Sequence, residues 1–93
     1  MRKDDCIFCK LANGDIPTNT IYEDDEFRVI MDAAPATKGH ALVLPKNHYA
    51  DIYEIDPDVL GRAIQVGQKV VKHATKVLEC DGYNLLQNNG TAA

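Results

Sequence analysis

Cysteine is scarce in this chain, and long apolar runs are missing. There are three cysteines among 93 residues, and an odd, small number does not build a disulfide framework. No apolar run approaches the roughly 20 residues that span a bilayer, and the first residues, MRKDDC, lack the apolar core of a signal peptide. We therefore expect a cytoplasmic protein that has no membrane partner and keeps its thiols reduced.

Positive charge is also in short supply. Ten Lys and Arg stand against fourteen Asp and Glu, which gives a net charge of −4 and a pI near 5.2. Binding to a nucleic-acid polymer needs clustered Lys and Arg, whereas the cationic residues here are scattered. The composition therefore argues against a nucleic-acid partner.

Several common functional motifs are missing. The sequence contains no GxxxxGK[ST], no GxGxxG and no GxSxG. The usual phosphate-binding loops and the nucleophile elbow of serine hydrolases are thereby excluded. Any chemistry has to come from other residues.

The composition that remains is that of one globular domain. Hydrophobic residues make up 45% and charged residues 26% of the chain, values typical of a packed protein. Ninety-three residues are enough for a single core but not for two. We expect residues 1–93 to form a single domain.

The first half of the chain has the pattern of a short helix followed by three strands. In CIFCKLANGDIP, apolar residues recur every three to four positions and then stop at an Asn-Gly pair, which predicts a short helix. Two β-rich runs, Thr20–Tyr22 and Phe27–Met31, flank four acidic residues and predict a hairpin. A third strand is predicted at Ala41–Leu44, ended by Pro45.

The second half begins with a long helix. Asp56 is a good N-cap, Pro57 suits the first helical position, and Gly82 lies just beyond the expected end. One face is predicted to be apolar, and it consists of Leu60, Ala63, Ile64, Val70, Val71, Ala74, Val77 and Leu78. YNLLQNNG then predicts a fourth strand running into a loop. This order of elements predicts an α+β domain with an antiparallel sheet.

Cys6 and Cys9 form a CxxC pair in the stretch DCIFCK, which suits either a metal site or a redox motif. A tetrahedral zinc site needs further Cys or His ligands. His48, in the loop after the third strand, could be one, or it could be an exposed turn residue. The redox alternative is weaker, because no βαβ pattern surrounds the pair and the residues between the cysteines are apolar.

The other histidines and the third cysteine give weaker signals. His73 lies among lysines in the long helix, which favours a solvated surface residue. Cys80 at the end of that helix is expected to be a small buried hydrophobe. His40, at the entrance to the third strand, fits a structural histidine better than a catalytic one when it is taken alone.

Polar residues after the second strand and near residue 90 each allow a structural and a functional interpretation. Asp32 follows the second strand, so it is either a turn residue or a carboxylate that binds ribose hydroxyls. Asn88 and Asn89, followed by Gly90, could contact a phosphate or could simply form a turn.

Taken together, the residues resemble a known family. The segment CIFCKLANGDIPTNTIYEDDEFRVIMDAAPATKGHALVLPKNHYADI is similar to the N-terminal half of the histidine triad (HIT) family. The resemblance runs from Cys6 to Gly90, through IFCKL, YEDDEF, the MD before P…GH.LV.PK.H, and NNG. It implies a HIT-like fold and a purine nucleoside monophosphate or phosphoramidate as ligand.

The resemblance also assigns roles to individual residues. The walls of the nucleobase pocket correspond to Ile7, Phe8, Leu11, Ile30 and Leu42. Asp32 matches the ribose-binding carboxylate, Asn88 a contact near the phosphate, and His40 a histidine that supports the catalytic cluster. In bacterial relatives that contain zinc, Cys6, Cys9 and His48 match three ligands of a structural Zn²⁺.

The sequence departs from the family at the signature motif H-x-H-x-H-x-x. In the family this motif follows a few residues after the position of NNGTAA and supplies the nucleophilic histidine, which attacks the α-phosphate. We therefore expect a C-terminally incomplete domain that lacks the fourth zinc ligand and the last strand and does not turn over substrate. The parent would be a homodimeric hydrolase or transferase of nucleoside phosphoramidates or related conjugates. The alternatives are a nucleotide-binding module without catalysis and a zinc-stabilised interaction module.

Overall fold

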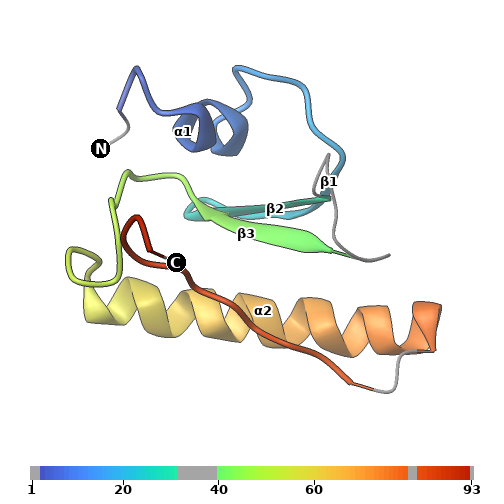
Figure 1. Ribbon diagram of the computed structural model, residues 1–93. Coiled ribbons are helices and arrows are strands. Elements are labelled where there is room, and N and C mark those ends of the chain that lie inside the picture. Colours follow the sequence, from blue (N-terminus) through green and yellow to red (C-terminus); the bar gives the residue numbers. More distant parts are fainter. Residues whose placement is uncertain (1–2, 32–39, 80–81, 93) are drawn as a thin grey trace. The chain divides into compact units, whose positions relative to one another are not determined.

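The computed structural model describes residues 3–31, 40–79 and 82–92. The chain divides into two compact units, Met1–His48 and Tyr49–Ala93. The first contains helix α1 (Ile7–Ala12) and strands β1 (Thr20–Glu23), β2 (Phe27–Met31) and β3 (Ala41–Pro45), and the second contains helix α2 (Pro57–Leu78) (Figure 1). The prediction of an α+β fold with an antiparallel sheet, one short helix and one long helix is confirmed.

The sheet has the order β1-β2-β3, and both pairs of neighbouring strands are antiparallel. The strands lie where the sequence predicts them, except that β1 and β3 each extend one residue further. Ile30 pairs with Leu42 and Arg28 with Leu44, so these side chains lie on the same face of the sheet. This face holds most of the apolar core described below.

Asp24 organises the turn between β1 and β2. One oxygen of its carboxylate accepts hydrogen bonds from the backbone N–H groups of Glu26 (2.8 Å) and Phe27 (2.7 Å). The other accepts from the Tyr22 hydroxyl at 2.8 Å. An aspartate side chain that binds nearby backbone N–H groups replaces hydrogen bonds that a tight turn leaves unmade. The acidic run in the sequence is therefore a turn with one structural carboxylate.

Helix α1 begins and ends through side-chain caps. Cys6 is the N-cap, and its sulfur accepts a hydrogen bond from the Cys9 N–H at 3.3 Å. At the other end, the Asn13 amide donates to the carbonyl oxygens of Cys9 (2.9 Å) and Lys46 (3.0 Å). Gly14 follows with φ of +84°, a conformation that favours glycine. The cap at Asn13 thereby joins the helix to the end of β3.

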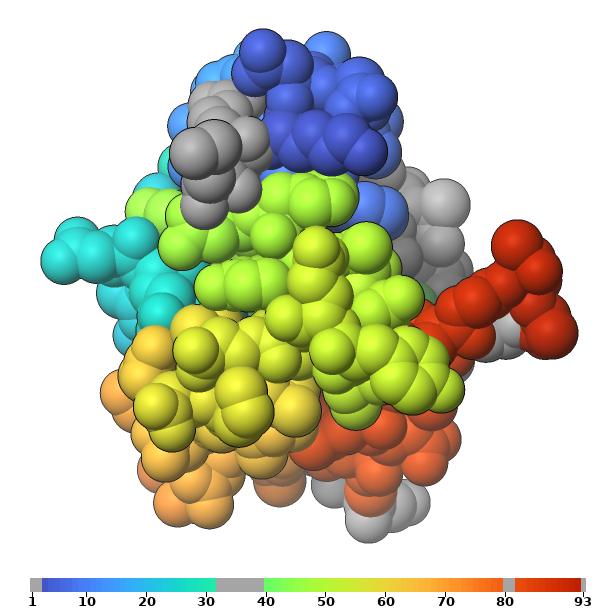
Figure 2. Space-filling model, turned by 90° about the vertical axis from the view of Figure 1, so that its left-hand side faces the viewer, coloured from blue at the N-terminus to red at the C-terminus, as the bar shows by residue number. Residues whose placement is uncertain are grey.

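The helix packs on the sheet through a small apolar core. Ala12, Ile30 and Leu44 are buried, and Leu11 and Leu42 pack against them. Figure 2 shows the α1 segment (blue) against the β3 segment (green). On the opposite side of β2, Phe27 and Val29 are fully buried. Both faces of β2 therefore carry buried apolar residues, and its burial does not alternate along the strand.

An ion-pair cluster ties the same elements together. The Glu23 carboxylate accepts hydrogen bonds from Arg28 at 2.9 Å and from the Lys46 ammonium at 2.8 Å. Arg28 also donates to the carbonyl oxygen of Leu11 in α1 at 3.3 Å. Residues of β1 and β2 and the residue after β3 thus meet at the Glu23 carboxylate, and Arg28 connects this cluster to α1.

In the second unit, α2 has the predicted start. The Asp56 carboxylate accepts from the N–H groups of Asp58 (2.8 Å) and Val59 (3.4 Å), and Pro57 is the first helical residue. The helix ends with Glu79 in the left-handed conformation at φ of 54°. A left-handed residue at this position is usually glycine.

None of the eight residues predicted for the apolar face of α2 is among the buried residues of the helix; six are partly buried and two are exposed. The buried residues of the helix are Val59, Val66 and Gly67, whereas Ile64 and Val77 are exposed. Val59 and Val66 lie two turns apart on one face, so burial follows this stripe. The helix carries more apolar residues than one buried stripe can accommodate.

The predicted fourth strand is wrong. Residues 83–89 form neither helix nor strand in the described chain. Tyr83 and Leu85 instead line a hollow of about 450 Å³, together with Ile64, Gln65, Gln68 and Val71. The segment has strand-forming residues, but a strand also needs a neighbour that accepts its backbone hydrogen bonds.

Neither helix could cross a membrane. Within the described part of the chain, no helix combines sufficient length with sufficient apolar character.

Candidate functional site

Cys6, Cys9 and His48 form a cluster of potential metal ligands in the first unit. Their donor atoms all lie within 4.8 Å of one another, and the Cys9 sulfur is 3.3 Å from Nδ1 of His48. The first two residues flank the first turn of α1, while His48 follows β3 by three residues. Packing of α1 on β3 brings together residues 39 positions apart.

The two cysteines are thiols in different surroundings. Cys9 is only 3% exposed, whereas Cys6 is partly exposed. Burial raises the pKa of the Cys6 thiol, but hydrogen bonds from the Cys9 backbone, the Cys9 and His48 side chains and the Phe8 backbone outweigh it and lower this pKa to about 7. These hydrogen bonds stabilise the thiolate, the form that binds metals.

This donor set fits a zinc ion. Zinc–sulfur bonds of about 2.3 Å and zinc–nitrogen bonds of about 2.1 Å at tetrahedral angles place ligand atoms about 3.4–3.8 Å apart. The observed limit of 4.8 Å requires only small side-chain rotations to reach this spacing. Two soft thiolates and one imidazole are the ligand types of structural zinc sites. A fourth position would remain for another ligand.

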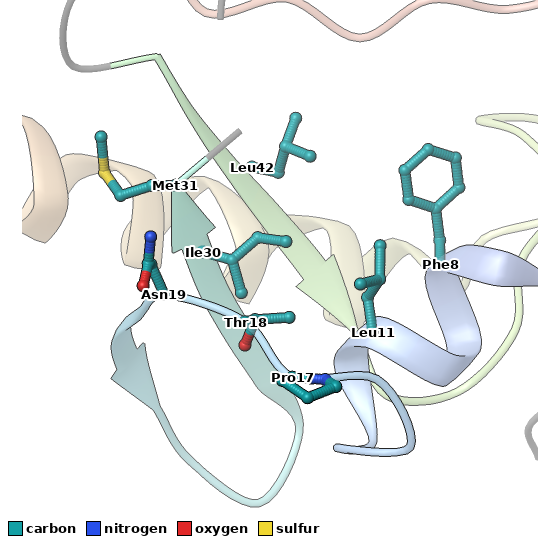
Figure 3. A pocket seen from close by; sticks show the side chains of 8 residues that line it. All are labelled: Phe8, Leu11, Pro17, Thr18, Asn19, Ile30, Met31 and Leu42. Atoms are coloured by element: carbon teal, nitrogen blue, oxygen red, sulfur yellow. The ribbon is translucent and has the colours of Figure 1, made fainter. Parts of the chain in front are cut away.

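An apolar pocket of about 380 Å³ opens beside α1. Figure 3 shows its lining side chains, which come from α1, from the segment before β1, and from β2 and β3. They are Phe8, Leu11, Pro17, Thr18, Asn19, Ile30, Met31 and Leu42. Pockets of this size and composition suit small ligands with a flat apolar part.

The structure brings together four of the five residues expected to form nucleobase walls. Phe8, Leu11, Ile30 and Leu42 line the pocket, whereas Ile7 is 60% exposed and is not among the lining residues. Ile7 and Phe8 are neighbours on a short helix, so their side chains leave it in different directions. Phe8 is itself 53% exposed, which leaves its ring available to a ligand.

The remaining lining residues were not predicted. Pro17, Thr18 and Asn19 belong to the connection between α1 and β1, and Met31 ends β2. The length of that connection was the only usable signal. Helix α1 lies on the sheet, and β1 is at the edge of that sheet. A short connection between them has to stay close to both elements.

Within the described ranges, the other predicted site residues are neither among the pocket-lining residues nor in the metal-ligand cluster. His40 directly precedes β3 and is partly buried. Asn88 is exposed in the second unit, while its neighbour Asn89 accepts a hydrogen bond from the Ile52 N–H at 2.8 Å. His73 is exposed on α2, as expected. Asp32 and Cys80 lie outside the described residues.

The two parts of the site share helix α1. Phe8, in the pocket, lies between the two cysteines of the metal cluster. An ion held by Cys6, Cys9 and His48 would fix the first turn of α1 against the end of β3, and with it the Phe8 ring. The cluster can therefore act structurally on the pocket without taking part in chemistry there.

Comparison with known proteins points to one family. A model of the HIT domain matches residues 13–93. A HIT-like protein from Methanocaldococcus jannaschii is 44% identical over 88 residues, which cover 95% of this chain and 67% of the relative. The adenosine 5′-monophosphoramidase of Schizosaccharomyces pombe is 41% identical, with coverage of 95% and 63%. The chain thus spans roughly two thirds of the length of these two relatives.

A solved structure agrees with these matches. A zinc-bound histidine triad family protein from Mycobacterium smegmatis superposes with a TM-score of 0.89 at 39% identity. The match covers 95% of this chain and 64% of that protein. The two proteins therefore share both their fold and a large part of their sequence.

Proposed function

The chain belongs to the HIT family, and from this membership we propose that it is the nucleotide-binding part of a hydrolase of purine nucleoside phosphoramidates or related nucleotide conjugates. The observation that carries the proposal is the apolar pocket lined by Phe8, Leu11, Ile30 and Leu42. The activity in the name of the Schizosaccharomyces pombe relative supports this class of substrate.

In this proposal the purine lies in the pocket beside the Phe8 ring. A flat aromatic base gains from apolar contact and from stacking on an aromatic side chain. The roles of Asp32 at the ribose hydroxyls and of Asn88 near the phosphate stay predictions. Ile7 has no role here, because it does not line the pocket.

We propose a structural role for zinc. Bound by Cys6, Cys9 and His48, the ion would supply a cross-link between α1 and the residues after β3. The side chains of this chain would then do the binding: the α1 turn holds Phe8 in place, and the β2 and β3 residues exclude water from the base.

The nucleophile in this proposal is a histidine that is not among these 93 residues, with His40 in a supporting position. The chain by itself should therefore bind nucleotide without turning over a phosphoramidate. The cytoplasmic location, the single domain and the homodimeric parent stay predictions.

Calorimetric titration of the zinc-loaded chain with AMP tests the proposal. We expect saturable binding that Phe8→Ala weakens about 5- to 150-fold, since loss of a base–aromatic stack costs about 1–3 kcal/mol. Ile7→Ala is the matched control, because it removes a neighbouring exposed side chain outside the pocket. The absence of binding at millimolar AMP, or equal losses in the two variants, would reject the proposal.

A second function is supported by the metal cluster alone. If the chain binds zinc but not nucleotide, it is a zinc-stabilised interaction module. Parallel titrations with zinc and with AMP separate the two possibilities.

A further inference from the structure

We propose that Cys6 and Cys9 form a reversible disulfide that excludes the metal, so that the thiol–disulfide balance of the surroundings controls metal occupancy. The inference rests on the proposed metal site and adds a form of regulation to it. It concerns the oxidation chemistry of the two thiols rather than the binding of nucleotide.

The two side chains already lie close enough for a disulfide to form by side-chain rotation. The Cys9 N–H donates to the Cys6 sulfur at 3.3 Å across the first turn of α1. The two sulfur atoms lie within 4.8 Å of each other. Cys6 is the N-cap with an extended backbone, so rotation about its side-chain bonds is not restricted by a preceding helical turn.

Metal binding and disulfide formation cannot occur together on these residues. Zinc needs both sulfur atoms as thiolates, whereas a disulfide has neither thiolate. His48 would remain as a single ligand, which is too few to hold the ion. Oxidation of the pair therefore releases the metal, and bound metal protects the pair.

The different exposure of the two thiols sets the order of the steps. Cys6 is partly exposed and Cys9 is 3% exposed, so an oxidant in solution reaches Cys6 first. With a low-molecular-weight disulfide as oxidant, the Cys6 thiolate attacks one of its sulfur atoms and expels the other half as a thiolate.

The second step closes the protein disulfide. The Cys9 sulfur attacks the Cys6 sulfur of the mixed disulfide and expels the remaining half of the oxidant as a thiolate. The two protein thiols lose two electrons and two protons, and the oxidant is reduced to two thiols. A small dithiol reverses both steps.

The test is oxidation of the reduced, metal-free chain by oxidised glutathione, followed by peptide mass spectrometry. The peptide that contains both cysteines should lose about 2 Da without gaining glutathione, and dithiothreitol should restore its mass. Zinc at about 100 times its dissociation constant should slow the reaction about 100-fold, because only the metal-free fraction reacts. Zinc release from the loaded chain is followed with a chromogenic chelator.

Matched variants assign the effect. Cys80→Ser should behave as the native chain, whereas Cys9→Ser should stop at the mixed disulfide on Cys6. His48→Ala keeps both thiols but removes a metal ligand, so its disulfide should form equally well whether or not zinc is present.

Two results would overturn the inference. One is a failure of the metal-free chain to form a disulfide between Cys6 and Cys9. The other is disulfide formation in the native chain at the same rate with and without saturating zinc. Neither readout involves nucleotide, so a failed AMP titration would reject the proposed function and leave the redox result unaffected.

Discussion

Asp24 shows how much of the hairpin depends on one side chain. Its carboxylate binds two backbone N–H groups and the Tyr22 hydroxyl, and those donors lose their partner in Asp24→Ala. We expect this variant to lower the free energy of unfolding by about 1–3 kcal/mol, as for lost hydrogen bonds to a charged acceptor. Urea titration measures the change.

Asp24→Asn is the control for this prediction. Its amide oxygen retains an acceptor for the backbone N–H groups but carries no charge, so an intermediate loss is expected. Equal stability of the Ala variant and the native protein would contradict the role assigned to the carboxylate.

Glu23 makes stability depend on pH. Hydrogen bonds from Lys46 and then Arg28 hold the pKa of this carboxylate below its usual range. Because the folded-state pKa is below the unfolded one, the unfolded chain takes up the proton first as pH falls. The ionised Glu23 carboxylate therefore adds to the free energy of unfolding at pH values above its unfolded-state pKa of about 4.3. This added stability is lost as the pH falls through the folded-state pKa.

Urea titrations of the native chain and Glu23→Gln test this effect. The native protein should be more stable near pH 7, and the difference should shrink as the pH is lowered below about 4. A difference that stays constant across this range would show that the ion pairs do not contribute.

At the scale of elements, α2 ends on an unfavourable residue. Glu79 adopts the left-handed conformation at φ of 54°, which costs an ordinary residue about 1 kcal/mol relative to glycine. We expect Glu79→Gly to raise the free energy of unfolding by about 0.5–1 kcal/mol. Thermal unfolding measures the gain.

A matched substitution inside the helix controls for flexibility. Lys72→Gly, at an exposed position in the interior of α2, should destabilise the chain by about 1 kcal/mol, because glycine in a helix interior costs backbone entropy. If Glu79→Gly also destabilises, the left-handed cap does not determine the stability of this helix end.

Most elements could be predicted because their signals are local. The cap at Asp56, the proline after it, and the β-rich run at 27–31 depend on residues close in sequence, and the structure confirms them. The strand expected in YNLLQNNG failed because strand formation also depends on a partner. Tyr83 and Leu85 have suitable side chains, but their backbone has no ladder in the described structure.

At the scale of the whole molecule, the site also combines features that the local sequence predicts with features that only the folded chain shows. The spacing of Cys6 and Cys9 is visible in the sequence, whereas the 3.3 Å approach of His48 to Cys9 requires α1 to pack on β3. The family resemblance named His48 and five wall residues, of which four line the pocket and Ile7 does not. The contribution of Thr18 and Asn19 came only from the folded chain, because neither has a local signal.

Zinc should therefore stabilise the first unit as a whole. Binding at 100 times the dissociation constant adds about 2.7 kcal/mol, which for a chain of this size raises Tm by about 10–20 °C. EDTA should reverse the increase. Amide hydrogen exchange should slow most in α1 and β3, because the three ligands flank these elements.

His48→Ala is the control for the zinc effect. It removes the ligand that connects the end of β3 to α1, so zinc should shift its Tm little and leave hydrogen exchange in β3 unchanged. Loss of a structural ligand lowers metal affinity steeply, because the remaining thiolates lie on one turn of α1. An equal zinc-dependent shift in this variant would mean that the ion binds elsewhere, and that the CxxC pair and His48 are not one site.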